Sequence, residues 1–162
     1  MNKGIINLNH GDTKNSYSAI YSNTHSDGYR ENNDYNRKTF TLSSNHFLTK
    51  KDEISFLASY VDLTAFIPSS INESTYLNSP KSAAFTWKQS QGYDNLFFET
   101  NYEFSEKTTL SIGLNLNKTS YKLADRYPVS EANTDQSGSY KFKNILSPKL
   151  GVSHLISNNV SV

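Results

Sequence analysis

Side chains that could perform catalysis or bind a metal are present in this chain, but their spacing favours neither activity. The four histidines lie far apart, at His10, His25, His46 and His154, without the close pairing that a zinc site requires. The chain has no cysteine, which excludes a disulfide framework, a zinc–thiolate site and a thiol nucleophile. No nucleophile elbow, phosphate-binding glycine loop or metalloprotease helix motif occurs. We therefore expect no enzyme activity, no metal site and no cofactor.

A charged segment surrounds the turn signal Asp27-Gly28, where glycine adopts a positive φ without strain. The side chains of Asp27, Arg30, Glu31 and Asp34 could line a ligand vestibule or bind a cation. The favoured interpretation is that they order an exposed loop through local ion pairs. The spacing of the three carboxylates does not match a calcium loop, which needs regularly placed oxygen ligands closed by a bidentate glutamate.

Aromatic residues in a second polar stretch are further candidates for ligand contact. Trp87 and Tyr93 could stack on an aromatic or sugar-like ligand, and Pro68 and Pro80 would stiffen the same stretch. The alternative is that Phe85 and Trp87 only anchor the stretch to its neighbours. The residues predicted to contact a ligand are Arg30, Trp87, Tyr93 and Arg126, the last within Arg126-Tyr127-Pro128.

The composition narrows the class of protein that could carry these residues. Only 35% of the chain is apolar, yet it contains 11 Tyr and 9 Phe, which suits strands with one apolar face and argues against disorder. The net charge is +1, so there is no basic surface for a nucleic acid. No run of about 18 apolar residues exists, so the sequence predicts no transmembrane helix.

Apolar and polar residues alternate along most of the chain, which predicts β-strands, because successive side chains of a strand point to opposite faces. The clearest stretch places Leu110, Ile112, Leu114 and Leu116 between polar or small neighbours. Comparable stretches are 54–60, 96–104 and 146–156, and weaker strands are expected at 3–9, 15–23 and 36–47.

The connections between these strands alternate between short and long. Short turns are expected near residues 10–14, 49–52, 105–107 and 157–159, and long loops near 24–35, 62–93 and 118–139. In an up-and-down antiparallel sheet every second connection lies at the same end, as in outer-membrane barrels with short periplasmic turns and long extracellular loops. A soluble β-sandwich remains the alternative.

Both ends of the chain suggest that residues 1–162 are part of a longer protein. The first residues lack the apolar core and cleavage site of a signal peptide, which an outer-membrane protein should carry. After Asn158-Asn159 the chain reads Val160-Ser161-Val162, the opening of a strand that does not continue. We expect a partial barrel of about seven strands and a truncated one.

Three segments resemble the barrels of TonB-dependent receptors, the outer-membrane transporters for siderophores and similar nutrients. The first is Ser26-Asp27-Gly28-Tyr29-Arg30-Glu31-Asn32-Asn33-Asp34-Tyr35, similar to a stretch at an early barrel loop. The second combines Ala65-Phe66-Ile67-Pro68-Ser69-Ser70, Ser79-Pro80, Ala83-Ala84-Phe85-Thr86-Trp87 and Gln91-Gly92-Tyr93, and resembles a long surface loop of receptors for iron siderophores or ferric citrate. The third is Ser147-Pro148-Lys149-Leu150-Gly151-Val152-Ser153, which resembles a barrel strand.

The resemblance implies an all-β fold, an antiparallel up-and-down meander that forms part of a transmembrane β-barrel in the bacterial outer membrane. It implies uptake of a ferric siderophore or similar iron chelate, with outer-membrane lipid, the chelate and TonB as partners. TonB would act through an N-terminal plug region that is absent from this sequence. The alternatives are a soluble or surface β-sandwich that binds carbohydrate and a passive porin.

Overall fold

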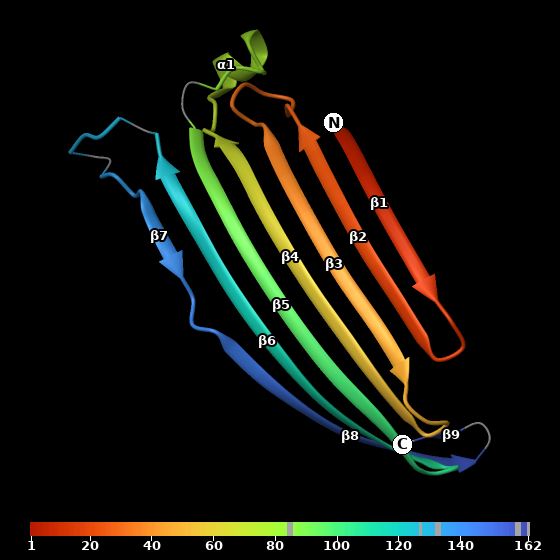
Figure 1. Cartoon of the computed structure of the whole chain (residues 1–162). Helices are drawn as coiled ribbons and strands as arrows, with labels where there is room; N and C mark the ends of the chain where they lie inside the picture. Colours follow the sequence, from red (N-terminus) through yellow and green to blue (C-terminus); the bar gives the residue numbers. More distant parts are fainter. Residues whose placement is uncertain (84–85, 127, 132–133, 158–159, 162) are drawn as a thin grey trace.

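The computed structural model describes residues 1–162 except 84–85, 127, 132–133, 158–159 and 162. It consists of one antiparallel sheet and one short helix (Figure 1). The elements are β1 (Asn2–Gly11), β2 (Asn15–Ser26), β3 (Tyr35–Phe47), β4 (Asp52–Pro68), α1 (Glu73–Asn78), β5 (Thr86–Ser105), β6 (Thr108–Asp125), β7 (Gly138–Lys141), β8 (Ile145–Ser157) and β9 (Val160–Ser161).

The strands follow one another across the sheet in chain order, which is the meander that the sequence predicts. The order is β1-β2-β3-β4-β5-β6-β8-β9. The short strand β7 pairs with residues 120–123 of β6, and β8 pairs with residues 108–117 of the same strand. The sheet does not close on itself within the described chain, since β1 is hydrogen-bonded only to β2. The seven strands expected from alternation correspond to β1–β6 and β8, and β9 to the truncated strand.

The sheet is a single layer, and it has almost no interior. Among the described residues only Thr24, Ala83 and Gly113 are buried, while large apolar side chains along every long strand remain exposed. No second sheet, as a β-sandwich would have, covers either face of the described chain. Among the described residues, no helix has the length and apolarity needed to cross a membrane.

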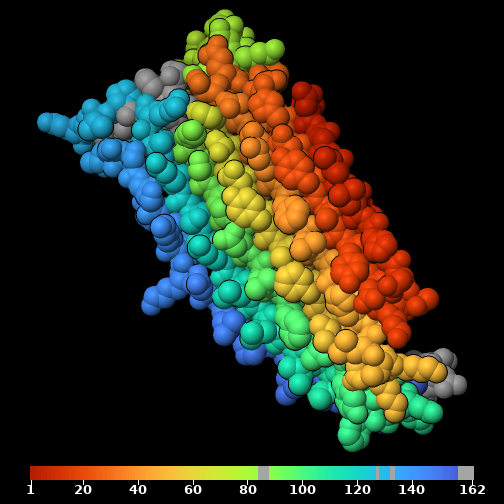
Figure 2. Space-filling model, in the orientation of Figure 1, coloured from red at the N-terminus to blue at the C-terminus, as the bar shows by residue number. Residues whose placement is uncertain are grey.

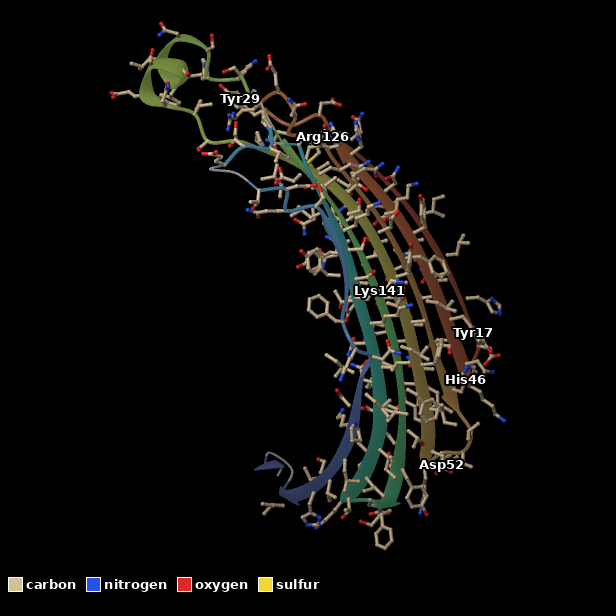
Figure 3. All side chains as sticks on the ribbon, turned by 90° about the vertical axis from the view of Figure 1, so that its left-hand side faces the viewer. Tyr17, Tyr29, His46, Asp52, Arg126 and Lys141 are labelled. Atoms are coloured by element: carbon tan, nitrogen blue, oxygen red, sulfur yellow. The ribbon has the colours of Figure 1, made fainter. Side chains whose placement is uncertain are left out.

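The strands bow along their length, which gives the sheet a convex and a concave face (Figure 3). Tyr17 and His46 lie on the convex side, which Figure 2 shows in full. The strand registers place further residues on this same face, because side chains paired across neighbouring strands share a face. One unbroken convex row consists of Leu8, Ala19, Leu42, Ala58, Leu96, Leu116 and Leu146.

The convex face carries a band of apolar side chains with polar residues beyond both of its edges. In β6 the band runs from Leu110 to Leu116, between Thr108 and Lys118. The two polar residues Thr108 and Lys118 lie ~33 Å apart along the strand, which is ~25 Å across a membrane at a tilt of about 40°. The apolar band between them therefore fits within the height of about 25 Å that outer-membrane barrels show. A row of aromatic residues marks the edge nearer the long connections: Tyr21, Phe40 and Tyr60.

The strands continue well beyond the apolar band, and this corrects the predicted loops. The stretches 62–68, 86–93 and 118–125 were expected in long loops, but they pair in β4, β5 and β6. Ile67 and Pro68 are therefore strand residues, not loop residues. In β5 polar side chains occupy both faces from Lys88 to Gln91, so the alternation that indicates a strand is lost there, although the strand pairing persists. In β4 the apolar side chains Leu63, Ala65 and Ile67 lie on the concave face, opposite to the face of the apolar band. With 20 residues, β5 is about twice as long as the 9–11 residues that cross a bilayer.

Short turns join the strands at the opposite end, as expected. Residues 12–14, 48–51 and 106–107 form three of them, and the expected turn at Asn158-Asn159 lies outside the described residues. In the first turn the carboxylate of Asp12 accepts the backbone N–H groups of Lys14 and Asn15, at 2.7 and 2.8 Å. These hydrogen bonds, that from Lys14 first, lower the pKa of Asp12 below its usual value.

Pro148 lies inside β8, and the register explains why the sheet tolerates it. Leu155 donates its N–H to the carbonyl of Lys107 at 2.7 Å. Hydrogen-bonded and non-hydrogen-bonded pairs alternate along an antiparallel ladder. Gly151 therefore directs its N–H at β6, whereas Pro148, paired with Leu114, occupies a position whose N–H would point away from β6.

We predict that Gly151→Pro reduces the amount of folded protein several-fold, because it removes an N–H that bonds to β6 where no water can replace it. Gly151→Ala is the matched control, since a Cβ there would lie 3.7 Å from Ser111, an ordinary contact. The measurement is the protease-resistant protein in outer-membrane fractions. Equal amounts for both variants would contradict the register.

Candidate functional site

The long connections gather at one end of the sheet, together with α1 (Figure 1). The β2–β3 connection docks on the segment that follows α1. The backbone N–H of Glu31 donates to the carbonyl of Lys81 at 2.8 Å, and the N–H of Ala83 donates to the Glu31 carboxylate at 3.3 Å. Asn32 donates its side-chain amide to the carbonyl of Ala83 at 3.1 Å. Ala83 is 3% exposed, so the contact excludes solvent and holds the two connections together.

Arg30 belongs to this junction. Its guanidinium Nη2 donates to the backbone carbonyl of Ser82 at 2.8 Å, and its buried Nε has no hydrogen-bond partner among the described residues. The residue therefore orders the loops, as the favoured interpretation expected. It does so through a backbone carbonyl and not through one of the predicted ion pairs. A nearby contact adds to the junction, because the ammonium of Lys81 lies 5.4 Å from the centre of the Tyr29 ring.

The conformation of the β2–β3 connection depends on two residues with positive φ. Gly28 has a φ of 77° and Asn32 a φ of 53°. A Cβ built on Gly28 would lie 2.2 Å from the carbonyl oxygen of Asn33, so no other side chain fits without moving the backbone. The turn predicted from Asp27-Gly28 is confirmed.

The concave face of the same end contains a shallow hollow between β3, β4 and β5. Its lining residues are Tyr35, Arg37, Val61, Leu63, Gln91 and Tyr93. Tyr93 pairs with Val61 across the strands, and its hydroxyl donates to Asn117 at 2.7 Å. Asn95 donates to the same Asn117 oxygen, so a polar network fixes the Tyr93 ring against the sheet.

Aromatic rings extend this concave surface toward β7. The rings of Tyr121 and Tyr140 stack with centroids 4.6 Å apart, and Phe142 lies 5.9 Å from Tyr121. Tyr121 pairs directly with Gln91, so the aromatic group adjoins the hollow. Tyr140 and Phe142 are 45% and 55% exposed, which leaves their ring surfaces available to a ligand.

Arg37 supplies a positive charge to this concave surface. It is exposed, it lies opposite Leu63, and it forms no ion pair among the described residues. A guanidinium binds carboxylates and other planar anions through paired hydrogen bonds. Together with the tyrosines it forms a surface that suits a bulky anionic ligand.

The four residues predicted to contact a ligand do not lie together in one site. Tyr93 lines the concave hollow, and Arg30 lies in the loop junction. The guanidinium of Arg126 lies 5.1 Å from the ring of Phe66, a residue of the convex face. Trp87 pairs in β5 with Ile67 and Asp125, and its side chain lies outside the described part. Of the predicted neighbours, Ala84-Phe85 and Tyr127 are likewise not described.

Sequence reasoning missed Tyr35, Arg37 and Gln91, and the aromatic group beside them. The signal was available, because Gln91 and Tyr93 continue the alternation of Asn95 and Phe97 toward the end of β5. The prediction of a long loop at residues 62–93 hides this signal, because side chains can be assigned to one of two faces only along a strand.

The described residues contain no group of three or more His, Asp or Glu side chains placed to hold a metal. The geometry at this end favours binding, with exposed rings, amides and a guanidinium on a fixed wall.

A family model described as TonB dependent receptor-like, beta-barrel matches residues 3–162. No curated protein and no solved structure gave a significant match.

We predict that Gly28→Ala disrupts the loop junction, because the new Cβ clashes with Asn33 in a backbone conformation that alanine rarely adopts. Limited proteolysis of intact cells should then cleave residues 27–34 at least several-fold faster. Gly4→Ala is the control, since nothing lies within 4 Å of a Cβ at that position. Unchanged cleavage in Gly28→Ala would contradict the described loop structure.

Proposed function

The chain belongs to the TonB-dependent receptor β-barrel family, and from this premise we propose that it takes part in the uptake of a ferric siderophore or similar iron chelate. Members of this family are outer-membrane receptors that transport ligands, and they interact with TonB and with membrane lipid. Family membership gives ligand transport in general, and the iron chelate is our proposal for the ligand. A passive porin is disfavoured, because family membership implies energised transport.

The observation that carries the proposal is the concave hollow at the long-loop end. The concave face of a barrel sheet is the luminal one, because the apolar convex face contacts lipid. Ferric chelates are bulky and commonly anionic, with flat aromatic or amide-bearing groups around the metal. Arg37 would bind the anionic groups, while Tyr35 and Tyr93 would stack on the flat ones.

The loop junction supports capture by these residues. Arg30 and Glu31 hold the β2–β3 connection on the segment after α1, directly beyond the strands that carry the hollow. Arg30 would thereby position the loops above the ligand and not contact it. Trp87 and Arg126 stay in the proposal as residues of the same end. TonB would drive release inward through a plug region, as in the family.

We predict that Arg37→Gln lowers the affinity for an anionic ferric chelate by about 10- to 100-fold, because one charge-assisted contact contributes about 1.5–3 kcal/mol. The measurement is iron-55 uptake by iron-starved cells from ferric citrate, a ferric catecholate and a ferric hydroxamate, each over a range of concentrations. Tyr93→Ala should weaken uptake of the same chelate. Tyr93→Phe keeps the ring and should weaken it less.

Lys38→Gln is the matched control, since Lys38 follows Arg37 in β3 and faces the convex side. Uptake that falls with Lys38→Gln and not with Arg37→Gln would overturn the luminal site. No uptake of any of the three chelates by the parent protein would overturn the choice of iron as cargo.

A further inference from the structure

One row of paired residues on the concave face joins Arg37 to the aromatic rings of β6 and β7. From β3 to β7 its members are Arg37, Leu63, Gln91, Tyr121 and Tyr140. Neighbouring strands lie about 4.8 Å apart, so the two ends of the row are separated by ~19 Å along the wall. Arg37 is the one charged member of this row. The row therefore has a cationic end and an uncharged, aromatic end.

A β-bulge between β7 and β8 turns the aromatic end toward the lumen. Even-numbered residues of β8, such as Leu146, lie on the convex face, whereas Tyr140 in β7 lies on the concave face. Two cross-strand pairs flank the bulge: Lys141 with Ser120, and Ile145 with Asn117. Residues 142–144 thus lie opposite residues 118–119 alone, and the extra residue exchanges the two faces. Without this bulge, the Tyr140 side chain would lie on the convex face.

Ring stacking and a backbone hydrogen bond fix the side chains that the bulge redirects. The rings of Tyr121 and Tyr140 stack with centroids 4.6 Å apart and planes at 19°, and Phe142 lies 5.9 Å from Tyr121. The N–H of Phe142 donates to the carbonyl of Thr119 at 3.1 Å. Tyr140 also leans over Gly138, since a Cβ on this glycine would lie 2.9 Å from the tyrosine ring. We call Tyr121, Tyr140 and Phe142 the aromatic shelf.

The exposure of the aromatic shelf and its surroundings favour an aromatic group as the ligand. Tyr140 and Phe142 are 45% and 55% exposed, and the next member of the row, Gln91, is an uncharged amide. Exposed aromatic rings stack on another ring in offset or edge-to-face arrangements. Ferric citrate and aliphatic hydroxamates contain no such ring, whereas each metal-binding group of a catecholate is an aromatic ring. The shelf thus offers a contact that only one of these chelate classes can make.

We propose that the aromatic shelf is a specificity subsite for an aryl group of the cargo, so that the receptor prefers a catecholate-type chelate to ferric citrate or an aliphatic hydroxamate. The inference rests on the proposed function, because it takes Arg37 as the contact of the anionic groups. The two ends of the row match the two parts of such a ligand. Arg37 binds the charge of the metal complex, and Tyr140 and Phe142 stack on an aryl ring that projects from it.

The experiment measures equilibrium binding to the full-length receptor, purified from outer membranes in detergent. The probes are the ferric complex of a tris(2,3-dihydroxybenzoyl) chelator, ferric citrate, and 2,3-dihydroxybenzoate without iron. We expect the double variant Tyr140→Ala, Phe142→Ala to bind the ferric catecholate at least about 5-fold more weakly, because two aromatic contacts are lost. Its binding of ferric citrate should not change. Gly138→Ala keeps all three rings but displaces Tyr140, and should weaken binding of the catecholate alone.

The matched control removes one tyrosine and one phenylalanine at the short-turn end of β5, Tyr102→Ala and Phe104→Ala, which are 44% and 74% exposed. This variant should bind like the parent, and heat resistance checks that every variant is folded. Parent-like binding of the catecholate by the shelf variant would overturn the proposal. So would an equal loss in the control, or an equal loss of ferric citrate binding.

Free 2,3-dihydroxybenzoate separates this inference from the choice of iron as cargo. Saturation-transfer NMR should detect contact of its ring protons with the parent and not with the shelf variant. If the parent binds neither ferric chelate but keeps this contact, the iron chelate is wrong and the aryl subsite stands. If the parent binds ferric citrate as tightly as the catecholate and the free acid makes no contact, the aryl subsite is wrong and iron uptake stands. Absence of all three kinds of binding overturns both.

Discussion

The alternating direction of side chains along a hydrogen-bonded strand is the constraint on which the other features of this molecule depend. A single-layer sheet has no core in which to bury apolar residues, so its stability comes from backbone ladders and from whatever covers its two faces. In the row from Leu8 to Leu146, seven strands present apolar side chains on one face, the face that contacts lipid. The opposite face is then free to be polar, and the role of each strand side chain in the concave hollow follows from the face on which its position falls.

That constraint explains how adjacent residues can have unrelated roles. Arg37 and Lys38 are neighbours in β3, yet the first lies on the luminal wall and the second on the lipid-facing surface. Gln91 and Gly92 separate in the same way, one lining the concave hollow and the other making room on the convex side. Side chains of the two surfaces thus alternate along each strand, and the chemistry of each surface can be changed without altering the other.

The sequence predicted the fold well where one face was apolar. The alternation around Leu110–Leu116 located β6, and the short turns at 12–14 and 48–51 followed from it. It failed beyond the apolar band, where Lys88, Gln89, Ser90 and Gln91 are polar on both faces. Backbone hydrogen bonds hold such residues in a strand, but the pattern of their side chains does not indicate one. The loop junction was equally inaccessible, since the contact of Arg30 with Ser82 joins residues 52 apart. Asp27-Gly28 was predictable, because its turn is a local property.

A shift of one residue between strands would exchange the two faces, so the register must be fixed inside the membrane as well as at the turns. The concave face contains contacts suited to this purpose. Asn95 donates to Asn115 and Asn117 across β5 and β6, at 2.7 and 2.6 Å. Glu99 and Lys149 form an ion pair at 2.5 Å that spans the intervening strand β6. Their registers meet at Gly113, where a side chain would crowd both partners. The Asn95 contacts favour one alignment of β5 with β6, and the Glu99–Lys149 pair favours one alignment of β5, β6 and β8. That alignment places Tyr93 toward the lumen and Leu114 toward lipid.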